Sequence, residues 1–157
     1  MVQAGITPPS TVRLVCDYAE PCLSAPDARL FEPGCGDGNF LVEVLTRRLQ
    51  KITSFESIVT FQNEVLLTVS NLYGIDIRPV AVSETRHRLR ILTTDFVNQR
   101  CQPDYRFAPL FEEILTRNFL TADLLRDRSK IIFPFWHKVR DFEFAMTPAI
   151  WPMEPNA

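Results

Sequence analysis

A glycine-rich segment flanked by carboxylates carries the most specific chemical signal in the chain. The segment is Glu32-Pro33-Gly34-Cys35-Gly36-Asp37-Gly38-Asn39-Phe40. Three glycines at alternate positions let the backbone bend tightly and approach a ligand without Cβ clashes. A helix that begins after such a turn directs free N–H groups and a partial positive charge at whatever lies over it. The segment therefore predicts a ligand-binding turn between a strand and a helix.

The residue types of the turn narrow the class of ligand. The dinucleotide fingerprint Gly-x-Gly-x-x-Gly fails, because with Gly34 and Gly36 as its first glycines the third falls on Asn39. A phosphate-binding P-loop needs Gly-Lys-Ser/Thr after its glycines, and this chain has none there. The remaining features are Glu32 before the turn and Asp37 inside it. Two carboxylates repel a pyrophosphate and favour a ligand with a cationic amino group and hydroxyls.

These nine residues resemble motif I of the class I S-adenosylmethionine-dependent methyltransferases. The Gly-Asn-Phe ending is especially similar to the adenine-N6 DNA methyltransferases of restriction–modification systems. The resemblance spans 7–125, with an extension to residue 151. It implies a Rossmann-like α/β fold, S-adenosyl-L-methionine as cofactor and DNA as methyl acceptor. The turn residues that it implies as cofactor contacts are Glu32, Gly34, Cys35, Gly36, Gly38, Asn39 and Phe40.

A further carboxylate, Asp76, stands near the end of a predicted strand over 72–77. At the tip of the second strand, a carboxylate can accept hydrogen bonds from both ribose hydroxyls of a nucleoside. In the resembled family the acidic residue here binds the ribose of the cofactor, and Asp76 is the matching position. Ile77, next to it, is carried over as a cofactor contact. Capping of the helix after Pro79 is a second role for Asp76 that is compatible with the first.

Two weaker elements extend the resemblance. Segment 118–125 resembles the family's Asn-x-x-x-Gly-Asp-x-Leu element, with Ala122 in place of the usual glycine. The resemblance implies that Asp123 accepts a hydrogen bond from the cofactor's adenine amino group, with Leu124 beside it. A solvated aspartate at a strand end is the alternative. Thr7, followed by proline, resembles the Thr-Pro element that lies against the methionine part of the cofactor, and a plain turn before a helix is the alternative.

The family's catalytic signature, Asn/Asp/Ser-Pro-Pro-Tyr/Phe/Trp, does not occur in this chain. In the family its polar side chain and first proline carbonyl accept the hydrogens of the target amine, and its aromatic ring stacks on the flipped base. The nearest segment is 146–151, after a strand-like run. There Thr147 replaces Asn or Asp and precedes Pro148, while Ala149 and Ile150 replace the second proline and the aromatic residue. Thr147 and Pro148 are the candidate catalytic residues, and a surface turn is the alternative.

The elements that must position these residues alternate between strand and helix. Strands are predicted over 28–32, 72–77, 118–121 and 142–146, and a short apolar run of undetermined type over 131–135. Helices are predicted over 11–18 with Ser10 as N-cap, from about 39 to 51, and over 57–70, 79–96 and 109–115. The alternation predicts an α/β fold with a doubly wound parallel sheet.

Composition and charge exclude several classes of protein. The 157 residues are 46% hydrophobic, which excludes wholesale disorder, collagen and coiled coil. The net charge of −2 gives no overall basic surface for nucleic acid, and the basic cluster at 86–90 is predicted to be a solvated helix face. The four cysteines form no Cys-x-x-Cys pair, which indicates reduced thiols rather than a zinc site. With no export signal and no apolar run of about 18 residues, the chain is predicted to be cytoplasmic, without a membrane partner.

The length restricts the function. We expect a single methyltransferase-like domain over 1–157, with a helical lead-in over 1–27, a cofactor-binding core over 28–125 and a degenerate catalytic strand and tail over 126–157. A full sheet of the resembled family has seven strands, so a sheet of about four is expected to be truncated. Three hypotheses follow: a methyltransferase acting on DNA adenine, a cofactor-binding module that needs a partner chain for strands or target recognition, and an α/β nucleotide binder of another class.

Overall fold

The computed structural model describes residues 7–23, 25, 27–127 and 131–150, and its elements follow the alternating order that the sequence predicts. The first half contains helices α1 (Pro9–Tyr18) and α2 (Glu20–Leu23), strand β1 (Leu30–Pro33), helices α3 (Asn39–Gln50) and α4 (Ile58–Ser70), and strand β2 (Leu72–Asp76). The second half contains helices α5 (Pro79–Asn98) and α6 (Phe107–Asn118) and strands β3 (Phe119–Thr121), β4 (Ile132–Arg140) and β5 (Glu143–Ile150). Within these residues no helix is long and apolar enough to span a bilayer.

Three of the strands form a parallel sheet in the order β1-β2-β3. In its register Leu30 of β1 lies opposite Leu72, and Gly74 of β2 lies opposite Phe119. Every residue of β2 is buried, as expected for the central strand of a parallel sheet. The predicted α/β fold with parallel strands is confirmed for these three strands.

The fourth predicted strand does not join this sheet, and that part of the prediction is wrong. Residues 142–146 belong mostly to β5, which pairs antiparallel with β4 in a separate hairpin. Only Asp141 and Phe142 connect the two strands. So short a connection allows antiparallel pairing alone, because a parallel neighbour needs a crossover of a dozen or more residues.

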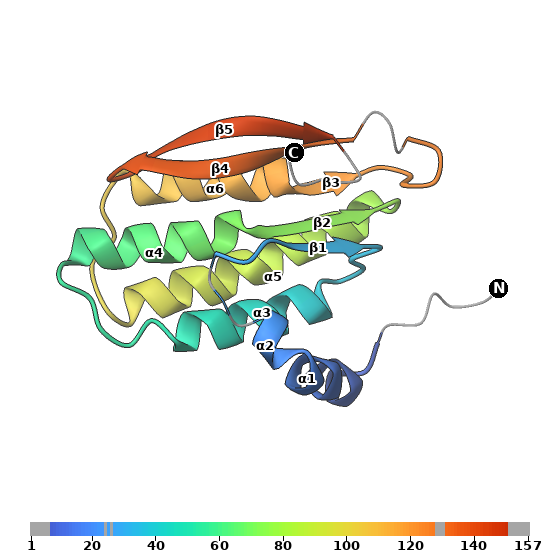
Figure 1. The fold of residues 1–157 in the computed structure, drawn as a ribbon, viewed down its shortest axis with the longest axis horizontal. Helices are drawn as coiled ribbons and strands as arrows, with labels where there is room; N and C mark the ends of the chain where they lie inside the picture. Colours follow the sequence, from blue (N-terminus) through green and yellow to red (C-terminus); the bar gives the residue numbers. More distant parts are fainter. Residues whose placement is uncertain (1–6, 24, 26, 128–130, 151–157) are drawn as a thin grey trace.

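The two faces of the sheet are covered by different elements. Side chains alternate along a strand, so Tyr73 and Ile75 share one face of β2, where they pack with Ile131 and Phe133. On the other face, a Cβ added at Gly74 would meet α3 and the turn before it. Figure 1 shows the β4–β5 hairpin and helices α3 and α5 on opposite sides of the three strands.

The ends of the helices follow local capping chemistry. Helix α4 begins at Ile58, one residue after the predicted start, and the hydroxyl of its N-cap Ser57 accepts a hydrogen bond from the backbone N–H of Thr60 at 3.0 Å. Helix α5 begins at Pro79, as predicted. The N-cap of α1 is Pro8 rather than the predicted Ser10, because Pro9 occupies the first helical position, where its missing N–H costs nothing.

A buried polar contact joins the hairpin to the sheet. The Asn118 side chain donates to the carbonyls of Ser70 and Leu72 at 3.0 and 2.9 Å, and its oxygen accepts a hydrogen bond from Trp136 Nε1 at 2.7 Å. Asn118 is fully buried and Trp136 nearly so. Because neither side chain is open to water, the contact fixes where β4 sits on the ends of α4 and α6.

The Trp136→Phe variant is expected to lower the free energy of unfolding by about 1–2 kcal/mol. Phenylalanine retains most of the apolar contact but leaves the buried Asn118 oxygen without its donor. Urea denaturation of both proteins measures the difference. An unchanged midpoint would contradict a structural role for this hydrogen bond.

Candidate functional site

The backbone of the glycine-rich turn needs its glycines. The N–H groups of Gly34 and Cys35 donate to the carbonyl of Ile75 at 2.8 Å each, which ties the turn to the end of β2. Gly34, Gly36 and Gly38 have φ angles of 75°, 54° and 76°. This left-handed region is strained for residues with a Cβ, so the alternate glycines are explained by backbone geometry.

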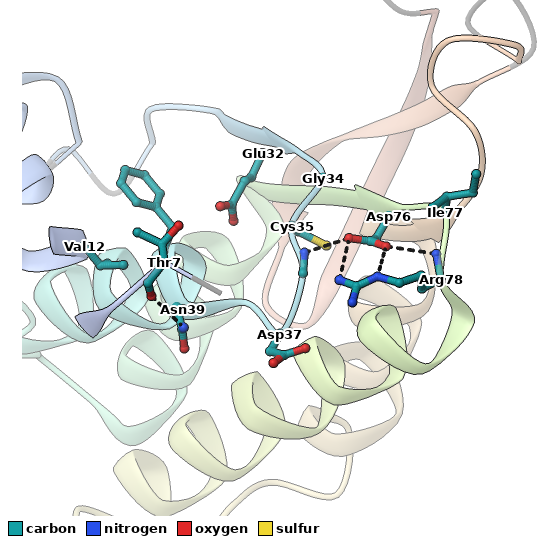
Figure 2. Close-up of a pocket in the computed structure, with 12 residues that line it drawn as sticks. Thr7, Val12, Glu32, Gly34, Cys35, Asp37, Asn39, Asp76, Ile77 and Arg78 are labelled. Carbon is teal, nitrogen blue, oxygen red and sulfur yellow. Dashed lines mark hydrogen bonds and ion pairs between the residues drawn. The ribbon is translucent and has the colours of Figure 1, made fainter. Parts of the chain in front are cut away.

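A cavity of about 410 Å³ lies over the turn, at the carboxyl ends of β1 and β2. Its volume falls in the range of about 300–1,000 Å³ typical of small-molecule sites. Figure 2 draws the residues that line it. They include nine of the twelve predicted cofactor residues: Thr7, Glu32, Gly34, Cys35, Gly36, Asn39, Phe40, Asp76 and Ile77. Residues from three separate stretches of the sequence therefore meet at one place.

Asp76 is held by four hydrogen bonds. Its Oδ2 accepts from the N–H of Gly36 at 3.0 Å and from Arg78 Nη2 at 3.4 Å. Its Oδ1 accepts from the N–H and the Nε of Arg78 at 2.9 and 3.1 Å. Burial opposes the charged form of this 7% exposed side chain, but the bonds from Arg78 and Gly36 outweigh burial and lower the pKa of the carboxyl. Asp76 is therefore an ionised acceptor directed at the turn.

The pKa of Glu32 is shifted in the opposite direction from that of Asp76. Burial raises its pKa from the usual 4.5 to about 7. Its Oε2 atom is buried and has no hydrogen-bond partner among the described residues. Glu32 lines the cavity, so a cationic group there would supply the missing donor and favour the ionised form.

Helix α5 makes hydrogen bonds to the glycine-rich turn through two residues that were not predicted as part of the site. Arg88 Nη1 donates to the Asp37 carbonyl at 2.6 Å and to Asn39 Oδ1 at 2.7 Å. Thr85 Oγ1 donates to the Gly36 carbonyl at 2.9 Å. Thr85 and Arg88 are three residues apart and so share a helix face. In the sequence, these two polar residues lie next to the apolar positions Val82 and Leu89, which are buried. This pattern could have indicated that Thr85 and Arg88 face the protein.

The basic cluster at 86–90 is solvated only in part, because His87 is exposed while its three arginines are half-buried. Besides Arg88, Arg86 Nη2 donates to the Thr116 carbonyl at 3.0 Å, and Arg90 Nη2 pairs with Glu112 Oε2 at 2.7 Å. These contacts join α5 to the turn and to α6. The predicted solvated face is wrong for the arginines, because their guanidinium groups bond to neighbouring elements.

Residues before and within α1 line one side of the cavity. Asn39 Nδ2 donates to the Thr7 carbonyl at 3.2 Å, and Val12 of α1 also lines the cavity. Thr7 therefore lies at the cavity, where the resemblance places it, and α1 forms part of one wall. Figure 2 shows Thr7 and Asn39 facing each other on the side away from Asp76.

Three predicted cofactor residues do not line the cavity. Gly38 is the N-cap of α3, where it adopts the left-handed backbone conformation that ends the turn. Asp123 follows β3, and its Oδ1 accepts from the N–H groups of Leu125 and Arg126 at 3.0 and 3.2 Å, which closes a local turn. Leu124 packs partly buried against the cluster between sheet and hairpin.

The candidate catalytic residues lie in the hairpin. Thr147 and Pro148 stand opposite Phe135 and Pro134 in the antiparallel register, so the predicted turn after a parallel strand is not present there. The reason is again the short connection between β4 and β5. Neither residue lines the cavity at the turn, and Pro148 instead borders a shallow groove between the hairpin and α6. Trp151 lies outside the described residues.

Fold and cavity together define an α/β protein with a three-stranded parallel sheet, an antiparallel hairpin and a cavity bordered by carboxylates at the strand ends. No family model matches the chain, and the searches of curated proteins and of solved structures returned no significant match. No group of three or more His, Cys, Asp or Glu side chains within the described part of the chain is arranged to hold a metal ion. An assignment of function therefore depends on the chemistry of the cavity.

Proposed function

We propose that this chain binds S-adenosyl-L-methionine in the cavity over the glycine-rich turn, as the cofactor-binding part of a class I methyltransferase. One observation carries the proposal: two carboxylates with different environments, Asp76 and Glu32, border the same cavity on either side of a glycine turn. A nucleoside with an amino-acid arm has a matching donor for each of them. The strand–turn–helix arrangement, with a cavity at the strand ends, supports the same class of fold.

The residues present fit the parts of this cofactor. Asp76 is ionised and fixed by backbone N–H groups, which suits an acceptor for two ribose hydroxyls. The unpartnered oxygen of Glu32 suits the cationic amino group of the methionine arm. Phe40 and Ile77 add apolar surface to the lining. When bound, the cofactor supplies an activated methyl group, and the chain's own residues hold and orient it.

The location of Thr147 and Pro148 favours a second candidate function, that of a cofactor-binding module without its own catalytic residues. Both residues are paired in the hairpin and neither lines the cavity. Methyl transfer requires the acceptor amine within reach of the cofactor, because positioning supplies most of the rate. A cofactor-binding module that acts with a partner chain is therefore the alternative to a methyltransferase that modifies DNA adenine by itself.

Calorimetric titration tests the binding proposal directly. We expect S-adenosylmethionine and S-adenosylhomocysteine to bind at one site per chain, and NAD to show no binding, because its pyrophosphate meets Glu32 and Asp37. If neither adenosyl compound binds, the proposal is wrong. Tighter binding of NAD would favour a nucleotide binder of another class.

Transfer of a labelled methyl group to mixed DNA separates the two functions. Label in DNA with the isolated chain indicates a self-sufficient enzyme. Binding without transfer indicates the partner-dependent module. Transfer that survives Thr147→Ala and Pro148→Ala would exclude these two residues from catalysis.

The Glu32→Gln variant is expected to remove a pH dependence of binding. In the wild type, affinity for S-adenosylhomocysteine should rise about five- to tenfold between about pH 6 and 7.5, as a carboxyl with a pKa of about 7 becomes ionised and attracts the amino group. Glutamine has no charge to gain, so its affinity should stay flat over this range. Calorimetry at several pH values measures both proteins.

The free chain should show the opposite trend in stability. Between about pH 4.5 and 7 the folded state retains a proton on Glu32 that the unfolded state has lost, so folding becomes less favourable as pH rises through this window. Glu32→Gln should reduce this decline in urea denaturation. A variant with the wild-type pH profile in both measurements would show that Glu32 does not titrate at the site.

A further inference from the structure

The side chain of Arg78 covers the carboxylate that the proposed ligand needs. Arg78 Nε and Nη2 bond to the two oxygens of Asp76, and Arg78 itself lines the cavity. A Cβ added at Gly36 would lie 3.8 Å from Arg78 Nη2, so the guanidinium also extends over the turn. Figure 2 shows it between Asp76 and the middle of the turn.

The acceptor positions of Asp76 are fully used in this arrangement. A carboxylate offers about four lone-pair positions. Two accept from backbone N–H groups, those of Gly36 and Arg78, and the other two accept from the Arg78 side chain. The backbone bonds are part of the turn, whereas the side-chain bonds can be exchanged for the two hydroxyls of a ribose.

The exchange is possible because the Arg78 side chain is half exposed and can turn into solvent, although Asp76 itself is buried. Two ribose hydroxyls would replace both hydrogen bonds that the guanidinium gives up. Asp37 also lines the cavity, and its charge acts on Arg78 in addition to that of Asp76, so a second carboxylate attracts the guanidinium. Its backbone N–H keeps its bond to Asp76 when the side chain moves.

We propose that Arg78 is a specificity-determining residue that competes with the ligand for Asp76, so that a ligand must present two adjacent hydroxyls to take its place. The inference rests on the proposed adenosyl ligand and adds a selection step to that site. A ligand without the hydroxyls leaves Arg78 on Asp76 and gains nothing from its removal. Arg78 therefore lowers the affinity for ligands with two adjacent hydroxyls, and it restricts binding at Asp76 to ligands that carry such a pair.

Calorimetry on Arg78→Ala tests this competition. We expect affinity for S-adenosylhomocysteine to rise about two- to fivefold, with no gain for its 2′,3′-dideoxy analogue. The gain should shrink at high salt, which weakens the wild-type ion pair. Arg78→Gln, which keeps the length of the side chain without its charge, should show the same direction.

The chain contains a matched control for this variant. Arg106 donates from its N–H, Nε and Nη2 to Asp104, the same Asp-x-Arg pattern, at a place that does not line the cavity. Arg106→Ala should leave ligand affinity unchanged.

The outcomes distinguish this inference from the proposed function. Wild-type binding with equal or weaker binding by Arg78→Ala overturns the competition and leaves the proposed function intact. Binding by Arg78→Ala where the wild type shows none supports the competition strongly. Absence of binding by both proteins overturns the proposed function and the competition with it.

Discussion

Replacement of Asp76 by alanine is expected to weaken binding of S-adenosylhomocysteine by about ten- to a hundredfold. The net loss is that of about one hydrogen bond to a charged group, about 1.5–3 kcal/mol, because the two ribose hydroxyls replace bonds that the Arg78 side chain already makes. A factor of ten in affinity corresponds to about 1.4 kcal/mol. The Asp76 carboxylate is fixed before the ligand arrives, because the N–H groups of Gly36 and Arg78 hold one oxygen each. Little ordering is therefore needed at this position when the ribose binds.

The matched control is Asp104→Ala. Asp104 accepts from Arg106 through the same set of donors that Arg78 offers to Asp76, but it stands before α6 and does not line the cavity. Both variants remove one carboxylate and one Asp-x-Arg ion pair, so their net charges stay equal. Only Asp76→Ala should change the affinity measured by calorimetry. Equal affinities in the two variants would contradict a ribose-binding role for Asp76.

The parallel part of the fold was predictable because its signals are local. The first of these short strands, for example, ends at Pro33, directly before the glycines of the turn. The alternate glycines predict a tight bend of the backbone, and all three have positive φ angles in the turn. The carboxyl ends of parallel strands meet at one edge, which is why Asp76 lies beside a turn 40 residues away in the chain.

The hairpin was not predictable in the same way, because strand pairing is decided between segments. The sequence predicts an apolar run over 131–135 and a strand over 142–146, whereas β5 continues past Pro148 to Ile150. Pro148 stands opposite Pro134 in the register, an arrangement that single-strand propensities do not anticipate. The sharp turn at Phe142, with a φ of 55°, brings the chain back on itself.

The supporting contacts of the site could not be predicted for a related reason. The backbone carbonyls of Gly36 and Asp37 are oriented by the turn, and only the packed fold shows that α5 lies within reach of them. From the sequence alone, Arg88 is one of several charges on a helix. Its role depends on a contact with a residue 51 positions away.

The Gly38→Ala variant is expected to destabilise the fold by about 2–5 kcal/mol, because backbone strain and overpacking both arise at this position. The φ angle of 76° places Gly38 in the left-handed region, which costs a residue with a Cβ about 1–2 kcal/mol. A Cβ there would also lie 2.9 Å from both Cγ2 and Oγ1 of Thr85, and relieving such overpacking costs about 1–3 kcal/mol. Thr85 is fully buried and holds the Gly36 carbonyl, so it cannot move away freely.

Gly34→Ala separates these two costs. Gly34 has a φ of 75°, but a Cβ there would meet nothing within 4 Å, so this variant should lose only about 1–2 kcal/mol. Thr85→Ala provides the complementary test, since it removes the two atoms that the added methyl would strike. In a double-mutant cycle measured by urea denaturation, Gly38→Ala should cost about 1–2 kcal/mol less in the Thr85→Ala background. Equal costs for Gly34→Ala and Gly38→Ala, with no coupling to Thr85, would show that the turn does not pack against α5 as closely as the structure indicates.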